Sequence, residues 1–439
     1  MTPLVRRVRD RARFLKLKAA CAGLAATLFA GAGSVASAQQ GDEQRFMRVA
    51  ESESDAKFSL EVAIRAYKPV SGEGPTVYLA SAVHLGEAEF YHELQTFLDG
   101  LDVVLFEQVR GPNEPEDPRW SGARDDDLKS DLSRRRATLL ATRIDEFRAR
   151  NGRYPESLVE LREAAGEDAP AFIDPALIDA WGESYGYSVI DEGGEPVAFV
   201  VSLGADGRVG GVGVDTDLYA SPDYLPEPKR VELRSRGMQP RLAKALGLQF
   251  QLAVMDHSAP TWRNADVTVT EVQQSLAEAG PQAAAQGEAL FQALSGDGLM
   301  GRLSGVLIGL VRVSPTMREM TKTMLIETVP QMESGAMTDN PMFGDLMEVI
   351  LDRRNDRVIA DLKRVLREEP EVRTIGIIYG AGHLPGIEGT LMSEMGYEPA
   401  AARWVKAMTA DLGSLGLDAS QARMMRDTVR RMVEAQMGR

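Results

Sequence analysis

The chain has 439 residues, a formal net charge of −15 at pH 7 and a single cysteine. This length suits two or three domains. The acidic surface repels a phosphate backbone, which argues against a nucleic-acid partner. Cys21 lies in the N-terminal segment, so the chain beyond it has neither a disulfide nor a thiol nucleophile.

The first 38 residues have the pattern of a secretory signal peptide. A basic segment precedes an apolar run, and small residues allow cleavage near Ala38. An uncleaved anchor is the alternative, but the apolar run is shorter than the ~20 residues that span a bilayer. We therefore expect a secreted or periplasmic protein with no stable membrane span after cleavage. The apolar run of residues 299–311 contains Arg302 and is expected to be a buried helix.

The mature chain begins with the pattern of an α/β domain, which we place at residues 39–112. Residues 76–83 predict a strand that ends at His84, and residues 88–97 predict a helix. A continuous apolar run then ends at Glu107, as is typical of a buried parallel strand. Strand, helix and strand in this order form a βαβ unit.

A change in composition marks an inserted module at residues 130–220. Loops rich in proline precede and follow it, at residues 111–127 and 219–229. Inside the module, residues 132–150 predict a helix that ends before Asn-Gly-Arg-Tyr-Pro, and short strands with Gly and Asp turns follow. The α/β pattern resumes at about residue 230, so the module interrupts a larger domain.

The loop of residues 203–217 combines Asp206, Asp215 and Asp217 with closely spaced glycines. Carboxylates and tightly turned backbone suit calcium, which takes six to eight oxygens at roughly 2.3–2.6 Å. The spacing does not fit an EF-hand. A glycine-rich surface turn with solvated acids is the alternative interpretation.

Two upstream segments distinguish between these interpretations: Asn-Gly-Arg-Tyr-Pro155 and Asp-Ala-Trp-Gly-Glu-Ser-Tyr-Gly-Tyr187. Together with the acidic loop they resemble the C-terminal domain of the major pseudopilin of type II secretion systems. The resemblance implies a structural calcium ion, and its ligands would be the Leu203 carbonyl, Asp206, Asp215 and Asp217. The hydrophobic helix that builds the pseudopilin fibre is missing, so the implied role is structural or adhesive.

The second part of the α/β domain is placed at residues 230–400. Its methionine-rich stretch is expected to be core packing. The expected elements are a helix at 239–246, a strand or helix at 250–255, a helical stretch at 271–332, a helix at 343–368, a buried strand at 374–379 and a helical extension at 401–439.

Three side chains that could bind a metal follow predicted buried strands: His84, Glu107 and His383. In open α/β sheets the carboxyl ends of strands bind ligands. Two imidazoles and a carboxylate at one edge suit a divalent metal with open positions for water. Taken alone, each histidine is more often a structural residue. Neither a Gly-x-Ser-x-Gly nor a His-Glu-x-x-His motif is present, so serine-hydrolase and zincin chemistry lack support.

Four segments carry a second resemblance: Tyr-Leu-Ala-Ser-Ala-Val-His84, Val-Val-Leu-Phe-Glu107, Asp-Arg-Arg-Asn355 and Ile-Ile-Tyr-Gly-Ala-Gly-His-Leu-Pro-Gly386. They resemble the TraB/PrgY/Tiki superfamily, which includes GumN-like and erythromycin-esterase-like members. The resemblance implies an α/β fold with a largely parallel central sheet flanked by helices. It also implies a metal-dependent protease site, although Ser81 replaces the glycine of the first Gly-x-x-His motif.

We therefore expect an exported metal-dependent hydrolase that cleaves a peptide, another amide or an ester. His84 and His383 would bind Mn, Co or Zn, and Glu107 would be a further ligand or the general base. Arg354 and Asn355 would face the site, with Arg354 stabilising an oxyanion or anchoring a substrate carboxylate. The alternatives are an inactive protein of the same fold that sequesters a peptide or signal molecule, and an envelope interaction protein.

Overall fold

The computed structural model describes most of the chain between residues 46 and 436. The described ranges are 46–52, 56–112, 114–122, 124–232, 238–285, 308–309, 311–333 and 344–436. The predicted signal peptide and most of the apolar run of residues 299–311 lie outside them.

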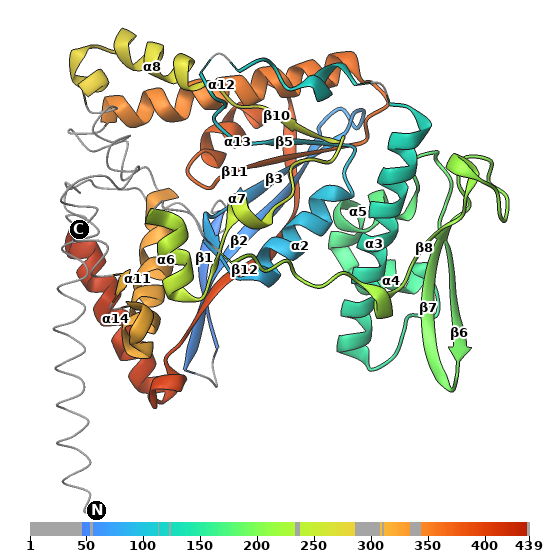
Figure 1. Cartoon of the computed structure of the whole chain (residues 1–439), viewed down its shortest axis with the longest axis horizontal. Helices are drawn as coiled ribbons and strands as arrows, with labels where there is room; N and C mark the ends of the chain where they lie inside the picture. Colours follow the sequence, from blue (N-terminus) through green and yellow to red (C-terminus); the bar gives the residue numbers. More distant parts are fainter. Residues whose placement is uncertain are drawn as a thin grey trace, which may run out of the picture.

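A mixed sheet of seven strands forms the centre of the described part of the chain (Figure 1). Its strands follow the order β1-β2-β3-β11-β5-β10, and β12 also pairs with β2. The strands are β1 (Met47–Glu51), β2 (Lys57–Pro69), β3 (Thr76–Ala82), β5 (Val103–Phe106), β10 (Trp262–Asn264), β11 (Thr374–Gly380) and β12 (Tyr397–Asp411).

Four neighbouring strands, β3, β11, β5 and β10, run parallel to one another. The short apolar runs of β5 and β11 are buried, as the continuous hydrophobic pattern predicts. The register pairs Gly380 with Ala82, and it pairs both Ile378 and Asn264 with Phe106. The carboxyl ends of all four strands therefore lie side by side at one edge of the sheet.

The other half of the sheet is antiparallel, so the prediction of a largely parallel sheet holds only for these four strands. β12 pairs antiparallel with β2 along its whole length. The predicted helical extension is therefore wrong for residues 401–411, which form a strand. Alanines favour a helix by propensity, but pairing with β2 and burial of Val405 and Met408 outweigh that preference. The helical prediction is confirmed only for α14 (Ala419–Gln436).

Helices cover both faces of the sheet. On one face, Val358 and Leu362 of α12 and Leu384 of α13 join a core with strand residues such as Ile377. On the other face, α2 packs against the sheet, while α11 and α14 pack together beside β12 (Figure 1). The bounds are α2 (Ala88–Asp99), α6 (Met238–Leu246), α7 (Gln251–Val254), α8 (Val269–Glu278), α11 (Pro315–Glu333), α12 (Gly344–Glu368), α13 (Leu384–Ser393) and α14 (Ala419–Gln436), with β4 (Leu85–Gly86) and β9 (Gln249–Phe250) forming a small second sheet.

The inserted module combines a long helix with a three-stranded antiparallel sheet, as predicted for an α+β insertion. Its long helix begins where the Asp125 side chain accepts a hydrogen bond from the Leu128 amide, and it ends at Gly152, whose φ of 70° is left-handed. The elements are α3 (Asp126–Asn151), α4 (Leu158–Ala164), α5 (Ala169–Phe172), β6 (Gly186–Glu192), β7 (Glu195–Ser202) and β8 (Leu218–Ala220).

A buried ion pair joins this module to the central sheet. Arg136 of α3 donates from Nη2 to Asp102 Oδ1 at 3.0 Å, and its side chain is 1% exposed. Asp102 immediately precedes β5, and its other oxygen accepts bonds from the Thr374 amide and hydroxyl at the start of β11. The module therefore docks at the amino ends of β5 and β11, opposite the edge where the parallel strands end.

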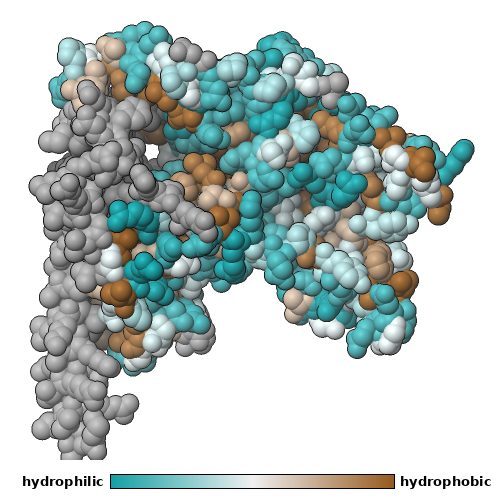
Figure 2. Space-filling view, viewed as in Figure 1, coloured by the Kyte–Doolittle hydropathy of each residue, from teal (hydrophilic) through white to brown (hydrophobic). Residues whose placement is uncertain are grey.

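The surface seen in Figure 2 is mainly hydrophilic, and its hydrophobic residues form small separate patches. No helix among the described residues combines the length and the apolar character needed to cross a membrane.

Replacing Arg136 with Met is expected to lower the free energy of unfolding by about 3 kcal/mol, because it leaves the buried Asp102 carboxylate without its closest cation. Urea unfolding followed by circular dichroism measures this loss. Arg134→Met is the matched control, since Arg134 is exposed on the same helix, and it should change stability by less than about 0.5 kcal/mol. Equal losses in both variants would contradict the assigned role of the ion pair.

Candidate functional site

Each of the four parallel strands is followed closely by a polar side chain. His84 follows β3, Glu107 follows β5, Asp266 follows β10, and His383 follows β11 at the start of α13. Helix α12 contributes Arg354 and Asn355 from above this edge. The structure thus brings together four of the predicted site residues, Glu107, His383, Arg354 and Asn355, and adds Asp266.

Glu107 is held as a carboxylate. Its Oε2 accepts a hydrogen bond from the Gly380 amide at 2.5 Å, and its Oε1 accepts one from Arg354 Nη2 at 2.5 Å. Burial alone would raise the pKa of Glu107, but Arg354, His383 and the Gly380 amide together lower it to about 2. Gly380 matters here because a Cβ at that position would lie 3.3 Å from Glu107 Oε2.

His383 is held as a neutral imidazole. Its Nδ1 lies 2.8 Å from Asn355 Oδ1, an acceptor, so Nδ1 carries the proton and donates it. Its Nε2 then accepts from Arg354 Nη1 at 3.2 Å. Burial lowers the pKa of His383 to about 4, and Arg354 acts in the same direction while Glu107 opposes it. Gly386 makes room for this arrangement, because a Cβ there would lie 2.6 Å from Asn355 Nδ2.

Asp266 anchors Arg354 through two hydrogen bonds. Arg354 Nε donates to Oδ1 at 2.9 Å and Nη2 donates to Oδ2 at 2.7 Å. The Asp266 side chain is 0% exposed, and its Oδ1 also accepts from the Val267 amide at 2.8 Å. With two carboxylates, one guanidinium and a neutral imidazole, the group carries a net negative charge.

His84 does not join this group in the structure. It is exposed, and its carbonyl accepts a hydrogen bond from the Gln251 amide. Within the described ranges, no three His, Cys, Asp or Glu side chains lie close enough together to hold a metal ion. The predicted three-ligand set of His84, Glu107 and His383 is therefore not assembled as it stands.

Two of the three predicted ligands nevertheless suit a cation. Glu107 Oε1 and His383 Nε2 lie 3.9 Å apart, and both groups are in the deprotonated states that a metal requires. However, both atoms receive hydrogen bonds from Arg354. A cation at this position would have to take the place of the Arg354 guanidinium.

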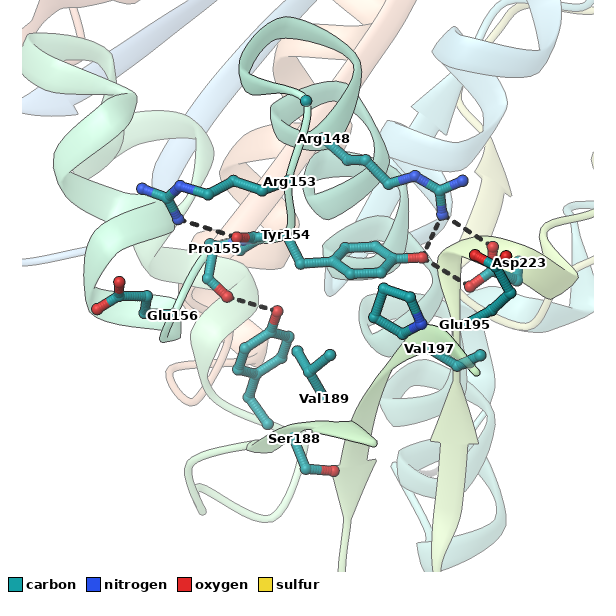
Figure 3. A pocket seen from close by; sticks show the side chains of 13 residues that line it. Arg148, Arg153, Tyr154, Pro155, Glu156, Ser188, Val189, Glu195, Val197 and Asp223 are labelled. Atoms are coloured by element: carbon teal, nitrogen blue, oxygen red, sulfur yellow. Dashed lines mark hydrogen bonds and ion pairs between the residues drawn. The ribbon is translucent and has the colours of Figure 1, made fainter. Parts of the chain in front are cut away.

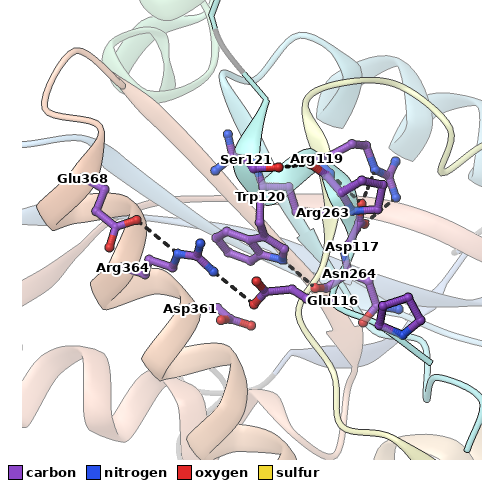
Figure 4. A network of polar contacts seen from close by, with 12 residues as sticks. Glu116, Asp117, Arg119, Trp120, Ser121, Arg263, Asn264, Asp361, Arg364 and Glu368 are labelled. Carbon is purple, nitrogen blue, oxygen red and sulfur yellow. Dashed lines mark hydrogen bonds and ion pairs between the residues drawn. The ribbon is translucent and has the colours of Figure 1, made fainter. Parts of the chain in front are cut away.

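The loop before the module contacts both α12, which carries Arg354, and β10, which precedes Asp266 (Figure 4). Glu116 accepts hydrogen bonds from Arg357 and Arg364 of α12. Trp120 donates to the Asn264 carbonyl at the end of β10 at 3.1 Å, and the guanidinium groups of Arg263 and Arg364 lie over its ring. These contacts hold α12 against β10 and so maintain the distance between Arg354 and Asp266.

His257 lies behind the site rather than in it. Its ring stacks on Phe106 at 4.6 Å and contacts Trp262, and its carbonyl accepts from Arg119. Burial lowers the pKa of His257 to about 4. This residue packs against the strand that presents Glu107, which is a structural role.

In the acidic loop of the module, the two carboxylate oxygens of Asp217 differ in their hydrogen bonding. Asp217 Oδ2 accepts from the Gly210 amide and the Tyr219 hydroxyl, whereas Asp217 Oδ1 is buried with no hydrogen-bond partner among the described residues. Asp206 accepts from the Arg208 amide in a local turn. A buried carboxylate oxygen without a donor suits a cation.

Two glycines allow this loop to close on the Asp215 carbonyl. A Cβ at Gly211 would lie 2.3 Å from the Asp215 oxygen, and one at Gly204 would lie 2.7 Å from it. Both glycines also have positive φ angles, of 96° and 68°. The three aspartates do not form a cluster of carboxylates by themselves, so a calcium site here would need backbone carbonyls such as that of Leu203.

A cleft of about 800 Å³ opens at the far end of the module between α3 and the β6–β7 hairpin (Figure 3). Its polar groups bond to one another: Tyr154 donates to Asp223 Oδ2 at 2.7 Å, and Arg148 donates to Asp223 and to Tyr154. Tyr187 donates to the Pro155 carbonyl at 2.7 Å. Because these groups are already paired, we assign them to the structure of the module.

Comparison with known families supports the identity of the module. Residues 123–221 match the family model of type II secretion system (T2SS) protein G. This match indicates an envelope or secreted context for the chain. No curated protein and no solved structure matches the chain. The resemblance of the flanking residues to the TraB/PrgY/Tiki superfamily therefore stays a prediction.

Asp266 was missed because β10 is only three residues long. Its sequence, Trp-Arg-Asn, has no apolar run to mark a strand. The signal that could have found it is the polar cluster Asn-Ala-Asp directly after that segment, which repeats the pattern of a charged residue after β5.

His257→Gln is expected to make stability less sensitive to acid. In the unfolded chain His257 binds a proton below about pH 6.5, whereas in the folded chain it stays neutral until about pH 4. The stability of the wild-type protein therefore falls as the pH is lowered through this interval. Removing the imidazole should reduce the acid-induced loss in the free energy of unfolding by on the order of 2 kcal/mol. Urea unfolding of both proteins near pH 7 and near pH 4.5 in metal-free buffer measures it; parallel losses would refute the assignment.

Proposed function

We propose that this chain is an exported metal-dependent hydrolase that cleaves an amide or ester bond at the carboxyl edge of the parallel strands. The observation that carries the proposal is the pairing of an ionised Glu107 with a neutral His383, 3.9 Å apart, inside a net negative group. A divalent cation bound there would supply Lewis-acid activation of water and of a carbonyl group.

The side chains at this site would have different roles. Glu107 and His383 would hold the cation, and His84, just after the adjacent strand β3, would complete the set if it turned inward. With a pKa of about 2, Glu107 is a weak base, which favours the ligand role over general-base catalysis. Asn355 fixes the His383 tautomer, as outer partners of metal-binding histidines do.

An inactive binding protein of the same fold is the second candidate, because Arg354 could hold a substrate carboxylate. In the structure this guanidinium is already paired with Glu107 and Asp266. A further anion would meet a net negative group, so the geometry favours the hydrolase over simple capture of an acidic ligand.

Hydrolysis of p-nitrophenyl butyrate and of fluorescently labelled casein tests the proposal, with Mn²⁺, Co²⁺ or Zn²⁺ added to metal-stripped protein. We expect metal-stimulated turnover that falls about 100-fold in Glu107→Gln and His383→Asn, because each removes a cation ligand. Glu398→Gln is the control, since Glu398 is exposed on β12, which is not one of the four parallel strands. Turnover that persists in Glu107→Gln would rule out this site.

We also propose that the loop of residues 203–217 holds a structural calcium ion through Asp217, Asp206, Asp215 and the Leu203 carbonyl. The buried Asp217 Oδ1 supports it, together with the match to T2SS protein G. The calcium ion would stiffen the module, and the chemistry would belong to the opposite edge of the sheet.

Saturating calcium is expected to raise the melting temperature of the wild-type protein by roughly 5 °C, because the ion binds only the folded loop. Asp217→Asn should abolish this shift. Glu192→Gln, which changes an exposed acid of β6 in the same module, should retain it. A shift of equal size in both variants would place calcium elsewhere.

A further inference from the structure

Arg354 donates hydrogen bonds to the two atoms that would bind the proposed cation. Its Nη2 lies 2.5 Å from Glu107 Oε1, and its Nη1 lies 3.2 Å from His383 Nε2. A guanidinium and a divalent cation within about 4 Å of each other repel strongly in a partly buried site, where screening is weak. Both cannot use these two acceptors at once.

Arg354 has a second anchor in Asp266, which shares the Nη2 donor with Glu107 and, among the described residues, alone accepts from Nε. Asp266 binds it through Oδ1 and Oδ2, at 2.9 and 2.7 Å. The Asp266 side chain is fully buried, so it needs a positive partner in every state of the site. The Val267 amide and the Asn264 side chain hold Asp266 in place.

We infer that Arg354 is an internal counter-ion that competes with a divalent cation for Glu107 and His383. When the cation binds, Arg354 withdraws from both groups and stays bound to Asp266. This inference rests on the proposed cation site, but it assigns a new role to Arg354 and to Asp266. The affinity for the cation would then depend on competition between the cation and the Arg354 guanidinium for the Glu107 carboxylate.

The exchange also explains how Arg354 becomes available to a substrate. While Nη1 donates to His383 Nε2, that N–H group is not available to a ligand at that position. Once a cation holds His383, Nη1 loses that acceptor and can donate to the developing oxyanion of a carbonyl substrate. Cation binding and oxyanion stabilisation are thereby coupled through one side chain.

Calorimetric titration of the full chain with Mn²⁺ tests the exchange without any substrate. Binding that disappears in a Glu107→Gln/His383→Asn double variant is assigned to this site. Arg354→Met removes the competitor and should bind Mn²⁺ about tenfold more tightly than wild type. Asp266→Asn removes the second anchor, leaves Arg354 on Glu107, and should bind about tenfold more weakly.

The opposite signs separate this role from a structural one, since a merely structural loss would weaken binding in both variants. Arg353→Met is the control on the same helix, because Arg353 is exposed and pairs with Glu278 of α8, and it should leave affinity unchanged. Arg354→Met leaves Asp266 uncompensated, so the Arg354→Met/Asp266→Asn variant restores the charge balance. It should also bind more tightly than Asp266→Asn alone.

Affinity in Arg354→Met no higher than in wild type would overturn the inference. Binding in Arg354→Met but not in wild type would support it, and would show that the metal-dependent form of the proposed function fails in the native chain. No Mn²⁺ binding in any variant would overturn the inference, whereas the substrate assay with Co²⁺ and Zn²⁺ judges the proposed function separately.

Discussion

Parallel hydrogen-bond pairing among β3, β11, β5 and β10 is the interaction on which the rest of the site depends. Segments that are up to 299 residues apart in sequence, such as those ending at His84 and His383, meet only because these strands end in register. A register shift by one residue would turn Glu107 to the opposite face of the sheet. The Glu107 carboxylate strengthens the arrangement by accepting the Gly380 amide of the neighbouring strand.

The same strands separate the two proposed ion sites. The module docks at their amino ends through Arg136 and Asp102, while Glu107 and His383 lie at their carboxyl ends. An insertion at this place extends the sheet domain without covering the edge where the polar side chains gather. The loop anchored by Trp120 crosses from one edge to the other and fixes α12 on the way. A calcium ion in the module would therefore act on stability rather than on chemistry.

Much of this arrangement could be predicted from sequence. The apolar runs of β5 and β11, the helices α2, α3 and α12, and the module itself are as expected, because their patterns are long or distinctive. β12 was mistaken for a helix because its alanines hide the alternation of a strand that is stabilised by pairing with β2. The structure brings Glu107, Arg354, Asn355 and His383 into contact, whereas His84, which was predicted to join them, is exposed. Asp266 and the position of Arg354 between the predicted ligands depend on tertiary packing, which a single sequence does not reveal.

We propose that one cation position lies between Glu107 and His383, and that Arg354 leaves this position when the cation binds. Anomalous diffraction from crystals soaked in Mn²⁺, recorded at the manganese edge, tests this most directly. We predict a peak bonded to Glu107 Oε1 and His383 Nε2, with Arg354 bound to Asp266 alone. Manganese found only in the loop of residues 203–217, with Arg354 still on Glu107 and His383, would contradict the account.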